Sequence, residues 1–422
     1  MEVIANEHHQ RLAAQHLAHM FKLAFRNIFR NRLRTFLTLA AISSGVAAII
    51  VSGGFVEDVF VQLRESTIHS RLGHIQIVRS GYLDYGRRDP MRYLIETPET
   101  VIPRIRAIPH VQAVMTRVNF SGLANNGRAD LPIIGEGVEA DKEAQLGTAM
   151  IFIAGHTLRD TDPFGVIVGE GVASALQLKL GSPLNLTVNT TQGALNSLEF
   201  RVIGIFRSFS KDFDDRAVRI TQASAQELLF TQAIHNVVIA LDETTRTEQT
   251  VSLLKQMLGK GKYEVKPWFE LADFYNKTVA LYKRQFGALQ FIILVMLVLS
   301  VASTVNMVVY ERTGEFGTLL ALGLKRLDIM KMVLIENALL GVMGGVLGIG
   351  LGMLVALFVS AVGLPMPPPP GSNAAYTASI RIVPMLLVTA ALTGAAAAAL
   401  AAVLPGRRAS RLPIVNALRH NI

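Results

Sequence analysis

Four long stretches without a charged side chain constrain this sequence more than any other feature. In its 422 residues, no Asp, Glu, Lys or Arg occurs over residues 35–56, 285–310, 337–380 and 382–406. A helix needs about 20 apolar residues to cross the hydrocarbon core of a membrane. Prolines at 365 and 367–370 end the helical part of the third stretch near Gly363. We therefore predict transmembrane helices at 35–56, 285–310, 333–361 and 382–404.

The first stretch has an alternative reading as the apolar part of a cleaved signal peptide. Such peptides carry roughly 7–15 apolar residues after a short basic segment. Here a long segment, residues 1–34, comes before a longer apolar stretch. The share of charged residues in the whole chain, 17%, is also low, since soluble domains carry about 25%. We therefore favour a membrane span.

Lysine and arginine beside the apolar stretches predict the orientation, because these residues gather in short cytoplasmic flanks. They occur before the first stretch, between the second and third, and after the fourth, at Lys22, Arg26, Arg30, Arg32, Arg34, Arg312, Lys325, Arg326, Lys331, Arg407, Arg408, Arg411 and Arg419. The loop between the third and fourth stretches has only Arg381. We therefore expect residues 1–34, the loop 311–332 and the tail 405–422 in the cytoplasm. Residues 57–284 and the Pro-rich loop 362–381 are expected outside.

Residues 57–284 have the pattern of a mixed α/β domain. Stretches rich in Val, Ile and Phe predict strands at 74–78, 111–118, 184–188, 200–206 and 237–241. Helices are expected at 97–107, 171–178, 224–230 and 245–258. The expected fold is an α-helical membrane protein with four transmembrane helices and a large mixed α/β extracytoplasmic (periplasmic) domain inserted between helices 1 and 2.

Apolar residues at near-helical spacing also flank this domain, around 55–63 and 271–282. They indicate that the first two membrane helices continue outward as a two-helix stalk. Two unrelated surface helices are the alternative.

A search for catalytic chemistry finds no site. The chain has no cysteine, which excludes disulfides and thiolate chemistry. Nucleotide-binding, serine-hydrolase and zinc-protease motifs do not occur, and the histidines have no recognisable ligand spacing. The net charge is +9, but the basic residues form no stripe interleaved with aromatics, so nucleic acid is not an expected partner. We predict a chain that is not an enzyme by itself and that needs no cofactor or metal.

The segment before the first span has the pattern of a helix lying in the cytoplasmic interface of the membrane. Apolar and basic residues fall on different faces of such a helix, and the residues concerned are Phe21, Lys22, Phe25, Arg26, Phe29 and Arg30. A simple N-terminal anchor is the alternative. Contact with membrane lipids follows from either reading.

The third span carries glycines at intervals of four residues. Small residues at this spacing let helices approach closely within lipid, and they are Gly341, Gly344, Gly345, Gly348 and Gly352. Two interpretations remain open. The glycines form either an interface that slides during function or a static contact within one subunit.

The cytoplasmic loop 311–332 is longer than a simple connection needs. Its charged and apolar residues suit a short amphipathic helix that docks into the groove of a partner. The candidate contact residues are Glu311, Arg312, Glu315, Leu319, Leu322 and Gly323. Glu336, near the cytoplasmic start of the third span, is tolerable there if it is paired or faces the bundle interior.

Several motifs along the chain resemble one family, the MacB/FtsX-like permeases of ABC transporters. They lie at 23–31, at 311–317 and 321–323 with Glu336, at 407–411 with Pro413 and 417–419, and in the outer domain at 168–170 with Gly181 and at 202–206. Within the family, the lipoprotein-releasing branch (LolC and LolE) is the nearest fit, partly because of the Pro-rich loop near 365–371. No clear match to that branch's carrier-binding hook occurs.

The resemblance implies a multi-pass permease subunit in the bacterial inner membrane, with both termini cytoplasmic. Two permease subunits, identical or paralogous, would pair with two cytoplasmic ABC ATPase subunits. ATP binding there would move the 311–332 loop, and the stalk would transmit this motion to the periplasmic domain. The substrate would be a lipoprotein, released to a periplasmic lipoprotein carrier, or another lipophilic molecule at the outer leaflet. An FtsX-like signal transmitter that activates an extracytoplasmic partner without transport is one alternative, and a receptor or adhesin without any ATPase is another.

Overall fold

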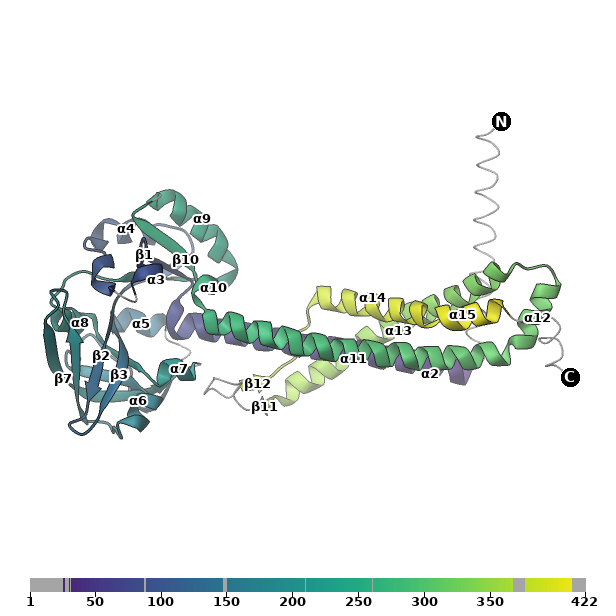
Figure 1. Ribbon diagram of the computed structural model, residues 1–422, viewed down its shortest axis with the longest axis horizontal. Helices are drawn as coiled ribbons and strands as arrows, with labels where there is room; N and C mark the ends of the chain where they lie inside the picture. Colours follow the sequence, from purple (N-terminus) through teal and green to yellow (C-terminus); the bar gives the residue numbers. More distant parts are fainter. Residues whose placement is uncertain are drawn as a thin grey trace, which may run out of the picture. The chain divides into compact units, whose positions relative to one another are not determined.

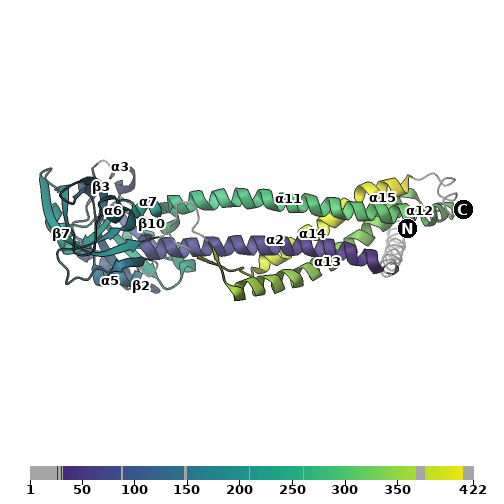
Figure 2. The ribbon, with the colours of Figure 1, turned by 90° about the horizontal axis from the view of Figure 1, so that it is seen from below.

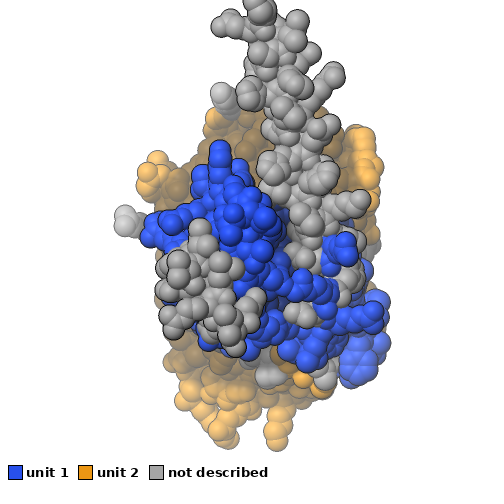
Figure 3. Space-filling model, turned by 90° about the vertical axis from the view of Figure 1, so that its right-hand side faces the viewer, with its two compact units in different colours: residues 1–59, 281–364, 377–422 blue, residues 60–280, 365–376 orange. Residues whose placement is uncertain are grey.

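The computed structural model describes residues 26, 30, 32–86, 89–146, 150–208, 210–259, 261–366 and 376–411. The chain divides into two compact units, which Figure 3 distinguishes by colour. Unit 1 comprises residues 1–59, 281–364 and 377–422, and unit 2 comprises residues 60–280 and 365–376.

Among the described residues, four helices are long and apolar enough to cross a membrane. They are α2 (Arg32–Thr67), α11 (Asp273–Glu311), α13 (Arg326–Val362) and α14 (Pro384–Ala401), the last followed closely by α15 (Val403–Ser410) (Figure 1). The short helix α12 (Thr313–Ala321) lies between α11 and α13 in the sequence. Helix α14 begins with a proline because the first helical position needs no amide hydrogen.

The core of unit 1 consists of apolar side chains from the long helices, including Ile42, Val301 and Ile329, together with Phe316 of α12. Helices α13 and α14 lie side by side (Figures 1 and 2). Large apolar side chains elsewhere on these helices, such as Phe291 and Phe358, are exposed. An apolar outer surface is what a lipid environment requires.

Helices α2 and α11 extend beyond the charge-free stretches that predicted them. Helix α2 continues past residue 56 to Thr67 and passes into a five-residue π-helical turn, Ile68–Leu72. Helix α11 begins at Asp273, well before residue 285. Both helices are therefore unbroken through the segments that we expect to form a stalk.

Unit 2 is built on a ten-stranded mixed sheet within the described residues, with strand order β10-β1-β9-β2-β3-β8-β5-β7-β4. Strand β6 lies off this path and pairs with β2 and β7. The strands are β1 (Ile75–Arg79), β2 (Val111–Asn125), β3 (Asp130–Val138), β4 (Ile151–Gly155), β5 (Gly165–Gly169), β6 (Pro183–Asn189), β7 (Leu195–Arg207), β8 (Ala217–Thr221), β9 (Asn236–Leu241) and β10 (Tyr263–Pro267). Pairing is antiparallel except between β3 and β8 and between β5 and β7.

Short helices accompany the sheet of unit 2. They are α3 (Tyr82–Tyr85), α4 (Ile102–Arg106), α5 (Ala140–Leu146), α6 (Glu170–Ala175), α7 (Lys211–Asp214), α8 (Gln222–Leu229), α9 (Thr247–Leu258) and α10 (Trp268–Leu271), with 3₁₀ turns at Pro90–Tyr93, Pro98–Thr100 and Thr244–Arg246. A separate two-stranded sheet pairs β11 (Leu364–Met366) with β12 (Tyr376–Ala378).

Two expected segments differ from the structure. The helix expected over 97–107 is a 3₁₀ turn followed by α4, in which Pro103 stands in the first turn. The loop expected over 311–332 holds α12, but α13 already begins at Arg326, because Asp328 accepts a hydrogen bond from the Lys325 amide at the helix start. The interfacial-helix residues Phe21, Lys22, Phe25 and Phe29, the prolines at 367–370 and the tail after residue 411 lie outside the described residues.

Candidate functional site

Arg312, between α11 and α12, links the short helix α12 to the long helix α13. Its Nε lies 3.0 Å from a carboxylate oxygen of Glu315, in the first turn of α12. Its Nη1 lies 2.9 Å from a carboxylate oxygen of Glu336 in α13. The side chains of Arg312 and Glu336 are only 11% and 12% exposed. Glu336 is therefore paired, which is the condition for tolerating a charge at this position.

Two further arginines complete this cluster from the start of α2. Arg30 forms an ion pair with Glu315, and Arg34 forms one with Glu311. From the sequence, both arginines were expected only as orientation signals, and Arg30 also as part of the polar face of an interfacial helix. A signal for the pairing was present, because 30 and 34 are four residues apart, as are 311 and 315. We call Arg30, Arg34, Glu311, Arg312, Glu315 and Glu336 the coupling cluster.

Helix α12 buries one side and ends in an exposed turn. Phe316 is fully buried in the core of unit 1, and the Arg312 guanidinium lies 5.2 Å from its ring centroid. Leu319 is half-buried against the same core. By contrast, the Leu322 side chain is 75% exposed. An apolar side chain this exposed is available to a partner protein.

Gly323 gives this exposed turn its shape. Its φ of +94° lies in the left-handed region, where a side chain is strained, and a β carbon there would meet no atom within 4 Å. The amide of Leu324 donates to the Leu319 carbonyl and that of Gly323 to the Leu320 carbonyl, which ends α12 as helix C-termini commonly end. Leu324 and Leu327 are also exposed. We call residues 322–327 the exposed turn.

The glycine stripe of α13 contacts two other helices of unit 1. One row of glycines faces branched side chains of α2, pairing Gly344 with Ile42, Gly348 with Val46 and Gly352 with Ile50. A β carbon at Gly348 would lie 2.6 Å from the Val46 β carbon, so a larger residue cannot fit without movement.

The other row of the stripe faces α14. A β carbon at Gly341 would lie 2.8 Å from the α carbon of Ala395, and one at Gly345 would lie 3.4 Å from that of Ala391. Both rows thus take part in close packing within one chain. That these contacts slide during function stays a prediction.

Unit 2 contains a second cluster of arginine and glutamate, which is buried. Glu136 of β3 accepts hydrogen bonds from Arg219 Nε at 2.8 Å and from Arg71 Nε at 3.1 Å. Arg117 of β2 is paired with Glu143 of α5. Burial by itself would raise the pKa of Glu136, but Arg219, Arg117 and Arg71 together lower it to about 2. We call these five residues the buried network.

The buried network also holds the π-helical turn in which α2 ends. Arg117 donates to the Arg71 carbonyl, and Arg219 donates to the Ser70 carbonyl at 3.3 Å. The Gln76 amide donates to the Leu72 carbonyl at 2.9 Å. Carbonyl groups at a helix end lack partners within the helix, so arginines from the sheet satisfy them.

No group of three or more His, Asp or Glu side chains that could hold a metal ion occurs among the described residues. The predictions that the chain needs no metal or cofactor and is not an enzyme by itself stay predictions.

Curated proteins similar to this chain are transport permeases. An ABC transporter permease of Methanocaldococcus jannaschii is 22% identical over 80% of this chain and 84% of its own length. The macrolide export ATP-binding/permease protein MacB of Hyphomonas neptunium is 22% identical over 95% of this chain, and the pyoverdine export ATP-binding/permease protein PvdT of Pseudomonas fluorescens is 24% identical over 94%. The chain spans only 61% and 58% of the lengths of the last two.

Solved structures similar to this chain cover about half of it. The periplasmic region of MacB from Actinobacillus actinomycetemcomitans matches 48% of this chain and 93% of its own, at 13% identity and a TM-score of 0.35. The extracellular domain of the ABC-type transporter YknZ matches 46% of this chain and all of its own, at 16% identity and a TM-score of 0.34.

Two family models match almost the whole described chain. The MacB-like periplasmic core domain matches residues 35–257, more than half of the sequence, and the FtsX-like permease C-terminal domain matches residues 287–414. These two matches confirm the family resemblance of the sequence motifs. The chain belongs to the MacB/FtsX-like family of ABC transporter permeases.

Proposed function

We propose that this chain is a permease subunit that couples ATP hydrolysis by separate cytoplasmic ATPase subunits to motion of unit 2 outside the bacterial inner membrane. Two copies of the chain, or one copy and a paralogue, assemble with two ATPase subunits. The termini and the exposed turn lie in the cytoplasm. The family to which the chain belongs supports this assembly.

The observation that carries the proposal is the connection of the exposed turn to three long helices. The exposed turn presents Leu322 outward, while Arg312 at the other end of α12 is held by Glu336 of α13. Glu315 in the same helix also contacts Arg30, just before α2. Hydrogen bonds between charged groups are shorter and stronger than those between neutral groups, and the Arg312–Glu336 pair is largely shielded from water. A force on the turn is therefore transmitted to α11, α13 and the start of α2 together.

The test replaces Leu322 with glutamate in the full chain, reconstituted in membranes with the ATPase subunit that copurifies with it. We expect stimulation of ATP hydrolysis to fall by about tenfold or more, as removal of one docking contact of ~1.4 kcal/mol would cause. Leu195→Glu is the matched control, because Leu195 is 76% exposed in unit 2 and does not belong to the turn. Normal stimulation in Leu322→Glu, at normal membrane insertion, would refute the coupling role.

The proposed substrate is lipophilic and is taken from the outer leaflet. Lipoprotein release by a LolC/LolE-like permease, with transfer to a periplasmic carrier, is the first candidate from the sequence motifs. Export of a small molecule is the second, because the MacB and PvdT relatives are named for macrolide and pyoverdine export. Stimulation of ATP hydrolysis by a purified lipoprotein, but not by its unacylated form, supports the first candidate and contradicts the second.

Signal transmission without transport is the alternative function. The unbroken course of α2 and α11 suits motion that is passed outward, whether or not a substrate follows. Reconstituted complexes distinguish the two functions. ATP hydrolysis that no lipophilic substrate stimulates, together with ATP-dependent activation of an extracytoplasmic partner, favours the signal transmitter.

A further inference from the structure

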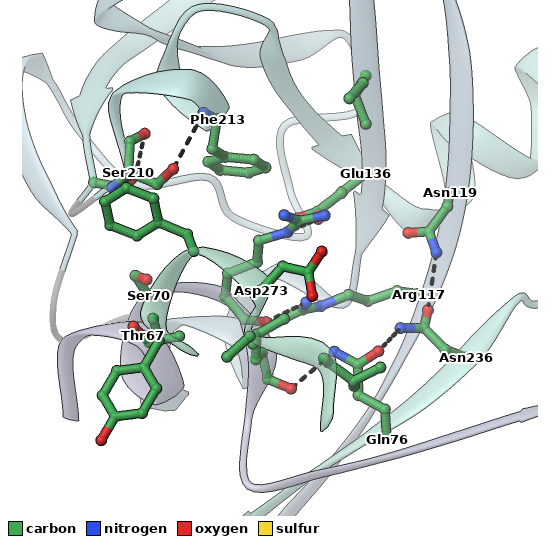
Figure 4. A pocket seen from close by; sticks show the side chains of 18 of the residues that line it. Thr67, Ser70, Gln76, Arg117, Asn119, Glu136, Ser210, Phe213, Asn236 and Asp273 are labelled. Atoms are coloured by element: carbon green, nitrogen blue, oxygen red, sulfur yellow. Dashed lines mark hydrogen bonds and ion pairs between the residues drawn. The ribbon is translucent and has the colours of Figure 1, made fainter. Parts of the chain in front are cut away.

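Unit 2 contains a pocket of about 570 Å³ beside the buried network (Figure 4). Its wall includes the π-helical turn at the end of α2, the first residues of α11, and parts of β2, β3 and β9. Small-molecule sites usually measure roughly 300–1,000 Å³ and combine an apolar lining with a few convergent polar groups. The size of this pocket falls in that range.

Part of the pocket wall is apolar. Phe213 borders the pocket (Figure 4) but is only 8% exposed, because the Arg71 guanidinium lies over its ring, 4.5 Å from the centroid. Leu83 and Ile134 line the same pocket and are exposed although apolar. Burying such a surface under a ligand is favourable in proportion to the apolar area covered.

Another part of the wall carries a chain of side-chain amides. Asn119 donates to the Tyr82 hydroxyl oxygen at 3.1 Å and to the side-chain oxygen of Asn236 at 3.4 Å. Asn236 donates to Gln76 at 3.1 Å, and Asn236 and Gln76 are both buried (Figure 4). These bonds fix the direction of each amide. In the described part of the chain they leave the Asn119 side-chain oxygen as an acceptor and the Tyr82 hydroxyl as a donor for a further partner.

The charges in the wall nearly cancel. Arg117 is already paired with Glu143, and Arg71 is paired with Glu136. Asp212 and Asp273 add negative charge at exposed positions of the lining, where water screens it. An anion would be repelled by two carboxylates on entering, and a cation would gain little, because water screens its attraction to them. The charges of the wall therefore favour an uncharged molecule over either ion.

We propose that this pocket binds a small uncharged molecule that has an apolar face and a hydroxyl or amide edge. The apolar face covers Leu83 and Ile134. The polar edge exchanges hydrogen bonds with Asn119 and Tyr82. The site goes beyond the proposed function, because it lies wholly in unit 2 and its occupation requires no ATPase. A bound molecule contacts the ends of both long helices where they join the sheet.

The chain has no cysteine, so one introduced thiol reports on the pocket without background. Ser70→Cys places the thiol in the pocket wall, and Ser252→Cys places one on the exposed side of α9, away from the pocket. The full-length variants are held in lipid nanodiscs without ATPase. The measurement is the rate of alkylation by N-ethylmaleimide with three six-carbon probes below their micelle concentrations: hexyl glucoside, hexyl sulfate and hexylammonium.

We expect hexyl glucoside to slow alkylation at residue 70 about fivefold at a concentration of roughly four times its dissociation constant. The two charged probes should slow it less than about twofold, and none should affect residue 252. The added change Asn119→Leu should abolish protection, because it removes the acceptor for the polar edge. Thr67→Cys, in the same wall, is the second reporter if the first variant does not fold.

Three results would overturn the assignment. They are equal protection by all three probes, stronger protection by a charged probe, and no protection of either reporter by hexyl glucoside. Because no ATPase is present, these outcomes leave the coupling role of the exposed turn untouched. Loss of ATPase stimulation in Leu322→Glu likewise leaves the pocket assignment untouched.

Discussion

The coupling cluster of unit 1 and the buried network of unit 2 are both built from arginine and glutamate, but they differ in how far water reaches the side chains. In the coupling cluster, the exposed fraction of the arginine side chains rises from 11% at Arg312 to 26% at Arg34 and 63% at Arg30. In the buried network, Arg117, Arg219, Glu136 and Glu143 are all nearly inaccessible. An ion pair that water can replace is easily broken and remade, whereas a buried pair is costly to break. The comparison indicates that the pairs of Arg30 and Arg34 break and form again more readily than those of the buried network.

The largest expected effect comes from removing one partner inside the buried network. Arg219→Met leaves Glu136 with a single remaining guanidinium at hydrogen-bond distance. We expect the free energy of unfolding to fall by about 3–5 kcal/mol. Urea unfolding of the full chain in detergent measures this, since the only tryptophan, Trp268, is buried in unit 2. Arg201→Met, at an exposed arginine of β7, is the control. Equal losses in the two variants would remove the contrast between buried and exposed charges.

Acid should destabilise unit 2 in two steps. Burial lowers the pKa of His74 and of His235 from 6.5 to about 4. As the pH falls, the unfolded chain therefore protonates these histidines before the folded chain does, and the free energy of unfolding falls between pH 6.5 and 4. Glu136, lowered to about 2, adds a second loss as the pH falls from 4.5 toward 2. Each of the three groups contributes on the order of 3 kcal/mol to the free energy of unfolding at neutral pH, and acid removes this contribution.

The measurement is Trp268-detected unfolding at a series of pH values. His74→Gln should shrink the upper step, and Glu136→Gln should remove the lower one. A stability profile that stays flat between pH 6.5 and 4 would contradict the first assignment.

A smaller effect on stability is expected in the coupling cluster. Arg312→Gln loses two charged hydrogen bonds, which are worth roughly 1.5–3 kcal/mol each, but Glu315 keeps Arg30 as a partner. Stimulation of the partner ATPase should fall about tenfold, because α12 is no longer held to α13. Arg407→Gln, at an exposed arginine of α15 outside both the cluster and the exposed turn, is the matched control. The cluster is not a coupling element if both variants stimulate ATP hydrolysis as the wild type does.

The smallest effect is expected for Arg30→Gln. This side chain is 63% exposed, and such surface pairs contribute about 0–1 kcal/mol. Stimulation should drop less than in Arg34→Gln, whose arginine is more buried, and the difference should narrow at high salt. Salt titration of ATPase stimulation in the two variants gives the measurement. The exposure gradient within the cluster has no functional meaning if Arg30→Gln has the stronger effect.

The membrane helices could be predicted from the sequence because crossing the lipid core requires a long run of apolar residues. Strands β1, β2, β6, β7 and β9 were visible for a similar local reason, namely runs of β-branched residues. Strand β3 was missed because Pro132, Gly135 and Gly137 interrupt its pattern, and β8 because Arg219 lies in its centre. Strand β3 is formed by pairing with β2 next to it and with β8 far along the chain, and the charge of Arg219 in β8 is balanced by Glu136 of β3.

The candidate site was predicted to the same extent and for the same reason. Local sequence patterns were enough to single out three of its residues. Gly323 ends a helix, Leu322 is apolar in a cytoplasmic loop, and Glu336 is a charge at a membrane span. The ion pairs of Arg30 and Arg34 depend on residues more than 270 positions away. The pocket of unit 2 has no local signature at all, because its wall is assembled from segments between Thr67 and Tyr275.

The π-helical turn at Ile68–Leu72 has a consequence for how chains of this architecture can vary in length. The Gly73 amide donates to the Ile68 carbonyl, five residues back, so this turn holds one residue more than an α-helical turn. Inserting a residue into an α-helix rotates everything after it by about 100°. A turn that stores the extra residue absorbs that rotation locally. Deleting the extra residue would therefore leave the preceding part of α2 in register, but it would disturb the carbonyl contacts that Arg117 and Arg219 make in this turn.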